Sequence, residues 1–226
     1  MSRLLVKICG MTREQDALLC AGLGADLLGF IFHPGSPRNT TPEFPAGLKV
    51  PGVRKVGVFV GQKSMEALGI MAAGRLDLAQ LHGGQSESFC QVLAARMGPE
   101  RIIKVVWPEK AASLEAFQAE LDRFAPYCGM FLADAGSNGG GHGRAIDPSA
   151  GGDILAAARF PRPWLLAGGL GPDNAAAMLS RFGPAGLDLN SGVESAPGVK
   201  DETRLRAAFD AIDALRCAAQ TQGVTP

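Results

Sequence analysis

The sequence predicts an α/β fold, a single-domain (β/α)8 TIM barrel spanning residues 1–226. Short runs rich in Val, Ile, Leu and Phe recur at intervals of roughly 25 residues, and each is followed by a turn and a helix-like stretch. Alternating strand and helix indicates a parallel sheet, and eight such units in 226 residues fit a closed barrel more simply than an open sheet. We expect no second domain and a flexible tail from about residue 219 to residue 226.

The eight predicted strands begin where the apolar runs begin. Their starts lie near Leu4, Leu27, Arg54, Leu78, Ile102, Met130, Trp164 and Leu187. Helices are predicted between and after them, at Arg13–Ala21, Ser64–Ala73, Glu87–Arg96, Ala111–Phe124, Pro172–Arg181 and Asp201–Arg216. Active sites of such barrels lie at the carboxyl ends of the strands, so functional residues are expected where each run ends and in the loop that follows.

Composition excludes several classes of protein. The 22 Lys and Arg residues balance the 22 Asp and Glu residues, so the chain has no large single-sign field for nucleic acid or a membrane surface. No signal-peptide pattern is present, and no apolar run approaches the roughly 20 residues of a membrane-spanning helix. We therefore expect a cytoplasmic protein. The five cysteines lack CxxC spacing, which argues against a disulfide framework and a structural zinc site.

The first predicted strand carries a thiol and an amine on one face. Lys7 and Cys9 are two residues apart, and because side chains alternate along a strand, both are expected to point into the barrel mouth. A nearby cation can lower the pKa of a thiol, and the thiolate is the form that acts as a base or nucleophile. Cys9 is therefore a candidate catalytic residue, and the alternative is an ordinary core cysteine.

Polar side chains stand at, or in the loop after, four further predicted strands. Asp134 closes the sixth run, either as a catalytic carboxylate or as a helix cap or salt-bridge partner. Asp188 lies in the eighth run, and His82 follows the fourth, where it contacts a ligand or orders a neighbour. Arg38 follows the second run in a Ser-Pro-Arg segment and is placed to bind a carboxylate bidentately.

Glycine-rich segments follow the last three predicted strands. Residues 139–144 (GGGHGR) suit either an anion-binding loop or a plain connector. Gly168 and Gly169 follow the seventh strand, and Ser191 and Gly192 follow the eighth. Barrel enzymes commonly bind phosphate with the loops after strands seven and eight, so a phosphate site is predicted here, with simple tight turns as the alternative.

Together these motifs resemble the phosphoribosylanthranilate isomerases of tryptophan biosynthesis. The matching segments span nearly the whole chain in the family's order: KICGMT at 7–12, GFIF and SPR within 29–38, QLHG at 80–83, LAD and GGHGR within 132–144, LAGGL at 166–170, and SGVE and PGVKD within 191–201. The resemblance implies an Amadori rearrangement of N-(5-phosphoribosyl)anthranilate to 1-(2-carboxyphenylamino)-1-deoxyribulose 5-phosphate. It implies a phosphosugar-anthranilate substrate and no cofactor or metal. The protein is expected to be a monomer or a homodimer, and the sequence does not decide between the two.

The resemblance also implies roles for the matched positions. Cys9 matches the general base, Asp134 the general acid, and Arg38 the position that binds the anthranilate carboxylate. This chemistry requires the pKa of Asp134 to be raised and that of Cys9 to be lowered. The positions expected around the phosphate are Gly141, Gly168, Gly169, Ser191 and Gly192, with Asp188 and His82 as their neighbours.

The chain departs from the family pattern at four places. Asn190 stands where serine is usual, His142 where threonine is usual, and His33 where tyrosine is frequent. The stretch Val105-Val106-Trp107 replaces a less bulky or basic one. None of these changes removes the acid, the base or the carboxylate contact, so we expect altered affinity more readily than an altered reaction.

Two other functions stay open. A related aminoaldose isomerase of histidine biosynthesis shares the phosphate loops but works with paired aspartates at the ends of strands one and five. Here strand one ends in Cys9 and no Asp closes strand five. A non-catalytic barrel scaffold would tolerate loss of Cys9 or Asp134, and both are present. A redox role for Cys9 is weaker still, because no resolving cysteine lies nearby in sequence.

Overall fold

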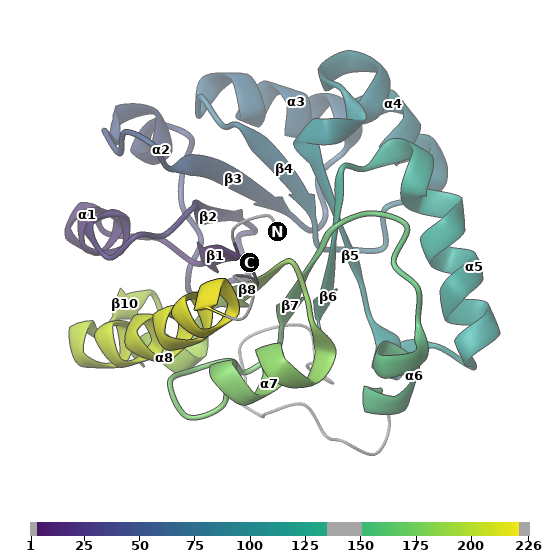
Figure 1. The fold of residues 1–226 in the computed structure, drawn as a ribbon. Helices are drawn as coiled ribbons and strands as arrows, with labels where there is room; N and C mark the ends of the chain where they lie inside the picture. The colour runs from purple at the N-terminus through teal and green to yellow at the C-terminus, as the bar shows by residue number, and fades with distance from the viewer. Residues whose placement is uncertain (1–3, 135–150, 222–226) are drawn as a thin grey trace.

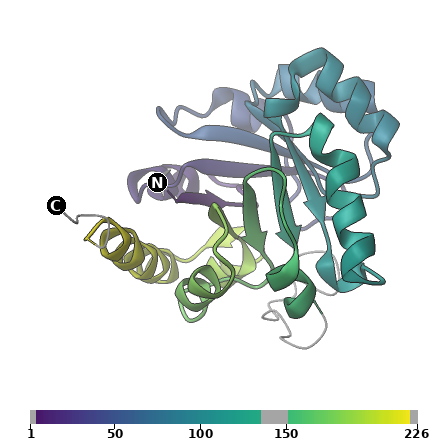
Figure 2. The same cartoon turned by 45° about the vertical axis from the view of Figure 1, so that its right-hand side comes forward.

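The computed structural model describes residues 4–134 and 151–221, with side chains described up to residue 215. Eight parallel strands close into a barrel in chain order, with helices around the outside (Figure 1). The view in Figure 2 shows the same helices outside the sheet from a second direction. The predicted (β/α)8 TIM barrel is confirmed.

The strands begin within one residue of their predicted starts. They are β1 (Leu5–Ile8), β2 (Leu27–Phe32), β3 (Arg54–Phe59), β4 (Leu78–Leu81), β5 (Ile102–Val106), β6 (Met130–Asp134), β7 (Trp164–Ala167) and β8 (Gly186–Leu189). Strand β1 pairs with both β2 and β8, and this closes the barrel. In that register Lys7 lies opposite Asp188, so closure brings two charged residues from the ends of the chain together.

Helices cover the barrel, and short elements join them to the strands. The helices are α1 (Glu14–Gly22), α2 (Glu43–Gly47), α3 (Ser64–Ala73), α4 (Glu87–Met97), α5 (Leu114–Phe124), α6 (Gly152–Ala157), α7 (Ala175–Phe182) and α8 (Glu202–Thr221). Single 3-10 turns are η1 (Pro99–Arg101), η2 (Pro108–Lys110), η3 (Ala125–Tyr127) and η4 (Ser191–Val193). A hairpin of β9 (Glu194–Ala196) and β10 (Val199–Lys200) separates β8 from α8.

Helix α7 begins at Ala175, later than the predicted start at Pro172. The side chain of Asn174 explains the difference, because it accepts a hydrogen bond from the Gly171 N–H at 2.9 Å and donates one to the Gly169 carbonyl at 3.1 Å. These bonds hold the preceding residues as a turn. The loop after β7 is therefore tied to the start of α7.

Two apolar layers make the core. The inner layer fills the barrel with alternate strand residues, namely Leu27, Val56, Leu78, Ile103, Val105, Leu132, Leu165 and Ala167. The outer layer lies between the strands and the helices and includes Phe30, Phe117 and Phe131. Alternation along each strand then directs the next inward positions, including Lys7, Gln80 and Asp134, towards the barrel mouth.

Four cysteines are buried free thiols: Cys9, Cys20, Cys90 and Cys128. Burial raises the pKa of Cys20 and of Cys128 to about 12, and it also raises the pKa of Cys90. These three thiols therefore stay protonated and pack as small apolar side chains. Among the helices of the described residues, none has the length and apolar character needed to cross a membrane.

Candidate active site

A buried ion pair lies at the carboxyl end of β1. The ammonium of Lys7 donates to both carboxylate oxygens of Asp188, at 2.9 and 2.8 Å. Burial alone would lower the pKa of Lys7, but Asp188 and Cys9 outweigh it and the net effect is a raised pKa. The lysine is therefore charged, and its charge is shared between Asp188 and the neighbouring thiol.

The predicted low pKa of Cys9 is wrong. Cys9 is 4% exposed, and its burial raises the pKa of the thiol above the ordinary value. Lys7 opposes this shift, but Asp188 reinforces it. Because burial outweighs the charge of Lys7, Cys9 is a neutral thiol in the ligand-free protein at neutral pH.

This shift predicts how Cys9 titrates. Subtracting the absorbance of Cys9→Ala from that of the wild-type protein isolates the thiolate of Cys9. This difference should rise only at pH values above the ordinary thiol pKa of about 8.5. In Lys7→Met the transition should move to still higher pH, because the opposing charge is gone. Ultraviolet absorbance recorded across a pH series measures the Cys9 transition in both proteins. A Cys9 transition below the ordinary value would contradict the burial effect.

Two glycines make room around Cys9. A Cβ added at Gly29 would lie 2.7 Å from the Sγ of Cys9 and 3.0 Å from the Nζ of Lys7. A Cβ at Gly10, whose φ is +78°, would lie 2.7 Å from the Cδ of Arg38. The thiol and the ammonium therefore both lie over β2, and the stem of Arg38 lies across the residue that follows Cys9.

A second polar chain links β4 to β6. The Nε2 of His82 lies 3.2 Å from the Oδ2 of Asp134, and the amide nitrogen of Gln80 lies 3.0 Å from the Nδ1 of His82. An amide N–H that donates to Nδ1 leaves the imidazole proton on Nε2, from which it donates to Asp134. The His82 ring also packs edge-on against Trp107, with centroids 5.9 Å apart. His82 thus orders Asp134.

These two groups share one mouth of the barrel. Burial raises the pKa of Asp188, and Lys7 and His82 oppose that shift while Asp134 adds to it. Such mutual electrostatic effects require the His82 and Asp134 pair to lie near the Lys7 and Asp188 pair. The thiol of Cys9 and the carboxyl of Asp134 therefore lie at the same mouth of the barrel, as an acid and base pair requires.

The loops after β7 and β8 pack against each other. Gly168 and Gly169 take the left-handed φ values of +107° and +62° that favour glycine. A Cβ on Gly192 would collide with the carbonyl oxygen of Leu170, so the two loops approach through backbone alone. Ser191 begins η4 beside this contact. The structure brings together the two loops that carry these four predicted phosphate residues, whereas Gly141 and His142 lie outside the described residues.

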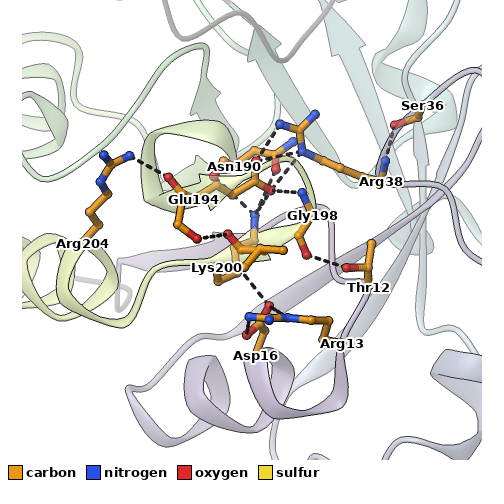
Figure 3. A network of polar contacts seen from close by, with 12 residues as sticks. Thr12, Arg13, Asp16, Ser36, Arg38, Asn190, Glu194, Gly198, Lys200 and Arg204 are labelled. Carbon is orange, nitrogen blue, oxygen red and sulfur yellow. Dashed lines mark hydrogen bonds and ion pairs between the residues drawn. The ribbon is translucent and has the colours of Figure 1, made fainter.

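Arg38 has a buried partner that sequence reasoning missed. Its Nε lies 3.0 and 3.1 Å from the two carboxylate oxygens of Glu194, and its Nη2 lies 2.6 Å from one of them (Figure 3). The same carboxylate accepts from Lys200 at 2.8 Å. Lys200 also donates to the side-chain oxygen of Asn190 at 3.1 Å, which gives this departure from the family pattern a structural role. The sequence feature that could have revealed this partner is the Glu and the Lys on either side of a Pro-Gly turn.

Known proteins resemble this chain along most of its length. The sequence model of the family "N-(5'phosphoribosyl)anthranilate (PRA) isomerase" matches residues 6–211. An N-(5'-phosphoribosyl)anthranilate isomerase of Maridesulfovibrio salexigens is 52% identical over 209 residues, which cover 92% of this chain and 98% of the relative. Within the described residues, no group of three or more His, Cys, Asp or Glu could hold a metal ion.

Two solved structures have the same architecture. A phosphoribosyl anthranilate isomerase from Thermus thermophilus is 38% identical with a TM-score of 0.78, over 94% of this chain and all of that one (100%). A phosphoribosyl anthranilate isomerase in complex with reduced 1-(o-carboxyphenylamino)-1-deoxyribulose 5-phosphate is 28% identical with a TM-score of 0.76, over 94% and 100% of the two chains. The chain belongs to the N-(5'-phosphoribosyl)anthranilate isomerase family.

Proposed function

We propose that this chain converts N-(5-phosphoribosyl)anthranilate to 1-(2-carboxyphenylamino)-1-deoxyribulose 5-phosphate, with Cys9 as the general base and Asp134 as the general acid. The observation that carries the proposal is the buried thiol beside Lys7 at the same barrel mouth as the carboxyl that His82 holds. Membership of the family supports the substrate. The reaction is acid and base catalysis without a cofactor.

The acid step opens the sugar ring. A protonated Asp134 gives its proton to the furanose oxygen as the bond from C1 to that oxygen breaks, and the nitrogen lone pair forms an iminium at C1. The Nε2–H of His82, whose nitrogen lies 3.2 Å from the Oδ2 of Asp134, then stabilises the carboxylate that remains. This hydrogen bond strengthens as charge develops on Asp134, so it favours the transition state over the ground state.

The base step moves a proton from C2 to C1. The iminium acidifies C2, and the Cys9 thiolate removes that proton to give an enol conjugated with the nitrogen. Protonation at C1 and loss of the enol proton then leave the ketone. Burial of Cys9 disfavours its thiolate in the free protein, but the iminium cation and Lys7 both favour it once substrate is bound. At the base step the Cys9 thiolate therefore stands beside the Asp134 carboxylate that the acid step leaves, and the proton of the resting thiol has passed to water.

The remaining residues hold the two ends of the substrate. Arg38 binds the anthranilate carboxylate, and the N–H groups of the loops after β7 and β8 bind the phosphate, at Gly168, Gly169, Ser191 and Gly192. Gly141, Asp188 and His82 stay predicted substrate neighbours. A cytoplasmic location and a monomeric or homodimeric state also stay predictions.

Arg38→Ala should mainly weaken substrate binding. Loss of a charge-assisted contact to the carboxylate should raise KM by about 10- to 100-fold and change kcat less. Steady-state kinetics measures both constants, and Arg206→Ala, which removes an exposed arginine paired with Glu202, is the matched control. An unchanged KM in Arg38→Ala would show that Arg38 does not bind the anthranilate carboxylate.

The aminoaldose isomerase of histidine biosynthesis is the alternative activity. Its paired aspartates would be expected at the ends of β1 and β5, where this chain has Cys9 after β1, and Val106 followed by Trp107 at β5. Assays of the purified protein with both substrates separate the two activities. We expect turnover of the anthranilate substrate, and preferential turnover of the aminoaldose would support the alternative.

A further inference from the structure

A buried cluster beside the mouth holds two cations and one carboxylate. Glu194 lies between Arg38 and Lys200, and all three side chains are at most 7% exposed. Burial alone would raise the pKa of Glu194, but the two cations outweigh it and the pKa is lowered. The carboxylate is therefore ionised, and it lies between the guanidinium of Arg38 and Lys200, whose own pKa burial lowers although Glu194 opposes that shift.

The hairpin of β9 and β10 fixes Glu194 in place. Glu194 and Lys200 lie opposite each other in its register, and the N–H of Gly198 donates to the Glu194 carboxylate at 3.2 Å. The guanidinium of Arg204 donates to the backbone carbonyl of Glu194 at 2.6 Å, and Thr12 donates to the carbonyl of Gly198 (Figure 3). The carboxylate is thus held from several directions, and it holds Arg38 in turn.

A second anchor comes from α1. The backbone N–H of Lys200 donates to Asp16 at 3.0 Å, and Asp16 is itself paired with Arg13 at 2.7 Å. The charge of Asp16 is therefore balanced by Arg13.

The pairing leaves Arg38 one edge for a ligand. A guanidinium is planar and can bind one carboxylate through Nε and Nη2 and a second through Nη1 and Nη2. Glu194 takes the first of these edges. The stem of Arg38 lies across Gly10, the residue that follows Cys9, so Arg38 lies close to the proposed base in the chain that lines the barrel mouth. A ligand carboxylate on the second edge would give the guanidinium a second anionic partner.

We propose that Glu194, held by Lys200, is a positioning residue that fixes the guanidinium of Arg38 so that its second edge receives the aromatic carboxylate of the substrate. This inference rests on the proposed role of Arg38. It assigns a function to the SGVE and PGVKD segments, which supply Glu194 and Lys200. A purely structural Glu194 would instead only join the hairpin to the barrel.

The test compares two substrates that differ in the carboxylate. Steady-state constants are measured for N-(5-phosphoribosyl)anthranilate and for N-(5-phosphoribosyl)aniline, which lacks that group, with the wild-type protein, Glu194→Gln and Arg38→Ala. We expect Glu194→Gln to raise KM for the anthranilate substrate by about tenfold or more, with a smaller effect on kcat. The loss with the aniline substrate should be much smaller.

Two further variants separate positioning from stability. Glu194→Gln with Lys200→Met removes one charge of each sign, so it spares the fold the cost of an unpaired buried Lys200. It should still lose selectivity for the carboxylate, because Arg38 is no longer fixed. Glu202→Gln replaces an exposed glutamate paired with Arg206 and should behave as the wild type.

The outcomes distinguish this inference from the proposal on which it rests. If Arg38→Ala discriminates between the two substrates but neither Glu194 variant does, Glu194 is structural and only the present inference fails. If the Glu194 variants lose activity equally on both substrates, Glu194 is again structural and only the present inference fails. If Arg38→Ala itself shows no discrimination, the carboxylate assignment of Arg38 fails, and the role of Glu194 fails with it.

Discussion

Cys9→Ala should fold normally and lose nearly all turnover. Removing a general base typically lowers kcat by roughly 10²- to 10⁴-fold, and alanine offers no group to accept the C2 proton. Alanine also preserves the packing around β1, because the thiol is small and Gly29 leaves room only for Sγ and the ammonium of Lys7. Steady-state kinetics and thermal melting measure activity and folding separately.

Cys90→Ala is the matched control for this variant. Cys90 is also a buried free thiol, but it lies on α4 in the outer core and its burial raises its pKa. It should keep wild-type turnover and tolerate a small loss of stability. Turnover of Cys9→Ala within tenfold of the Cys90→Ala value would exclude Cys9 as the base.

Asp134→Asn should have a comparably large effect. An amide cannot give up a proton to the furanose oxygen, so kcat should fall by roughly 10²- to 10⁴-fold. The Asn oxygen can still accept the hydrogen bond from His82, which lies 3.2 Å from the carboxylate, so the pocket should keep its shape. Kinetics with saturating substrate isolates the loss in kcat from any change in binding.

The matched control here is Asp77→Asn. Asp77 precedes β4 at the opposite end of the barrel, where its carboxylate accepts a hydrogen bond from the Lys55 N–H at 2.7 Å. Its substitution should leave kcat unchanged. If Asp134→Asn retained turnover similar to that of Asp77→Asn, another group would have to supply the proton, and the acid assignment would be lost.

The barrel was predictable because buried parallel strands leave a strong signal. Each strand is covered on both faces, so it reads as an apolar run bounded by turns, and all eight starts were placed within one residue. The alternation of side chains along each strand also predicted that Lys7, Asp134 and Asp188 point inward and are buried, as they are in the structure. Helices α2 and α6 were missed because five and six residues are too short for a helical period to show.

The site was harder to predict where it depends on distant residues. The sequence puts Lys7 next to Cys9 and so suggests a lowered pKa, but burial of the thiol and the pairing of Lys7 with Asp188, 181 positions away, reverse that direction. Arg38 likewise meets Glu194 across 156 positions. Such contacts follow from the closing of the barrel and the β9 and β10 hairpin, which no local pattern encodes.

Turnover of freshly made N-(5-phosphoribosyl)anthranilate by the purified protein, with the histidine-pathway aminoaldose as second substrate, tests the proposed activity most directly. A barrel with a thiol after β1 and a carboxyl at the end of β6 should convert the first substrate with the higher kcat/KM. Failure of the folded protein to convert it, or a higher kcat/KM for the aminoaldose, would contradict the proposed reaction.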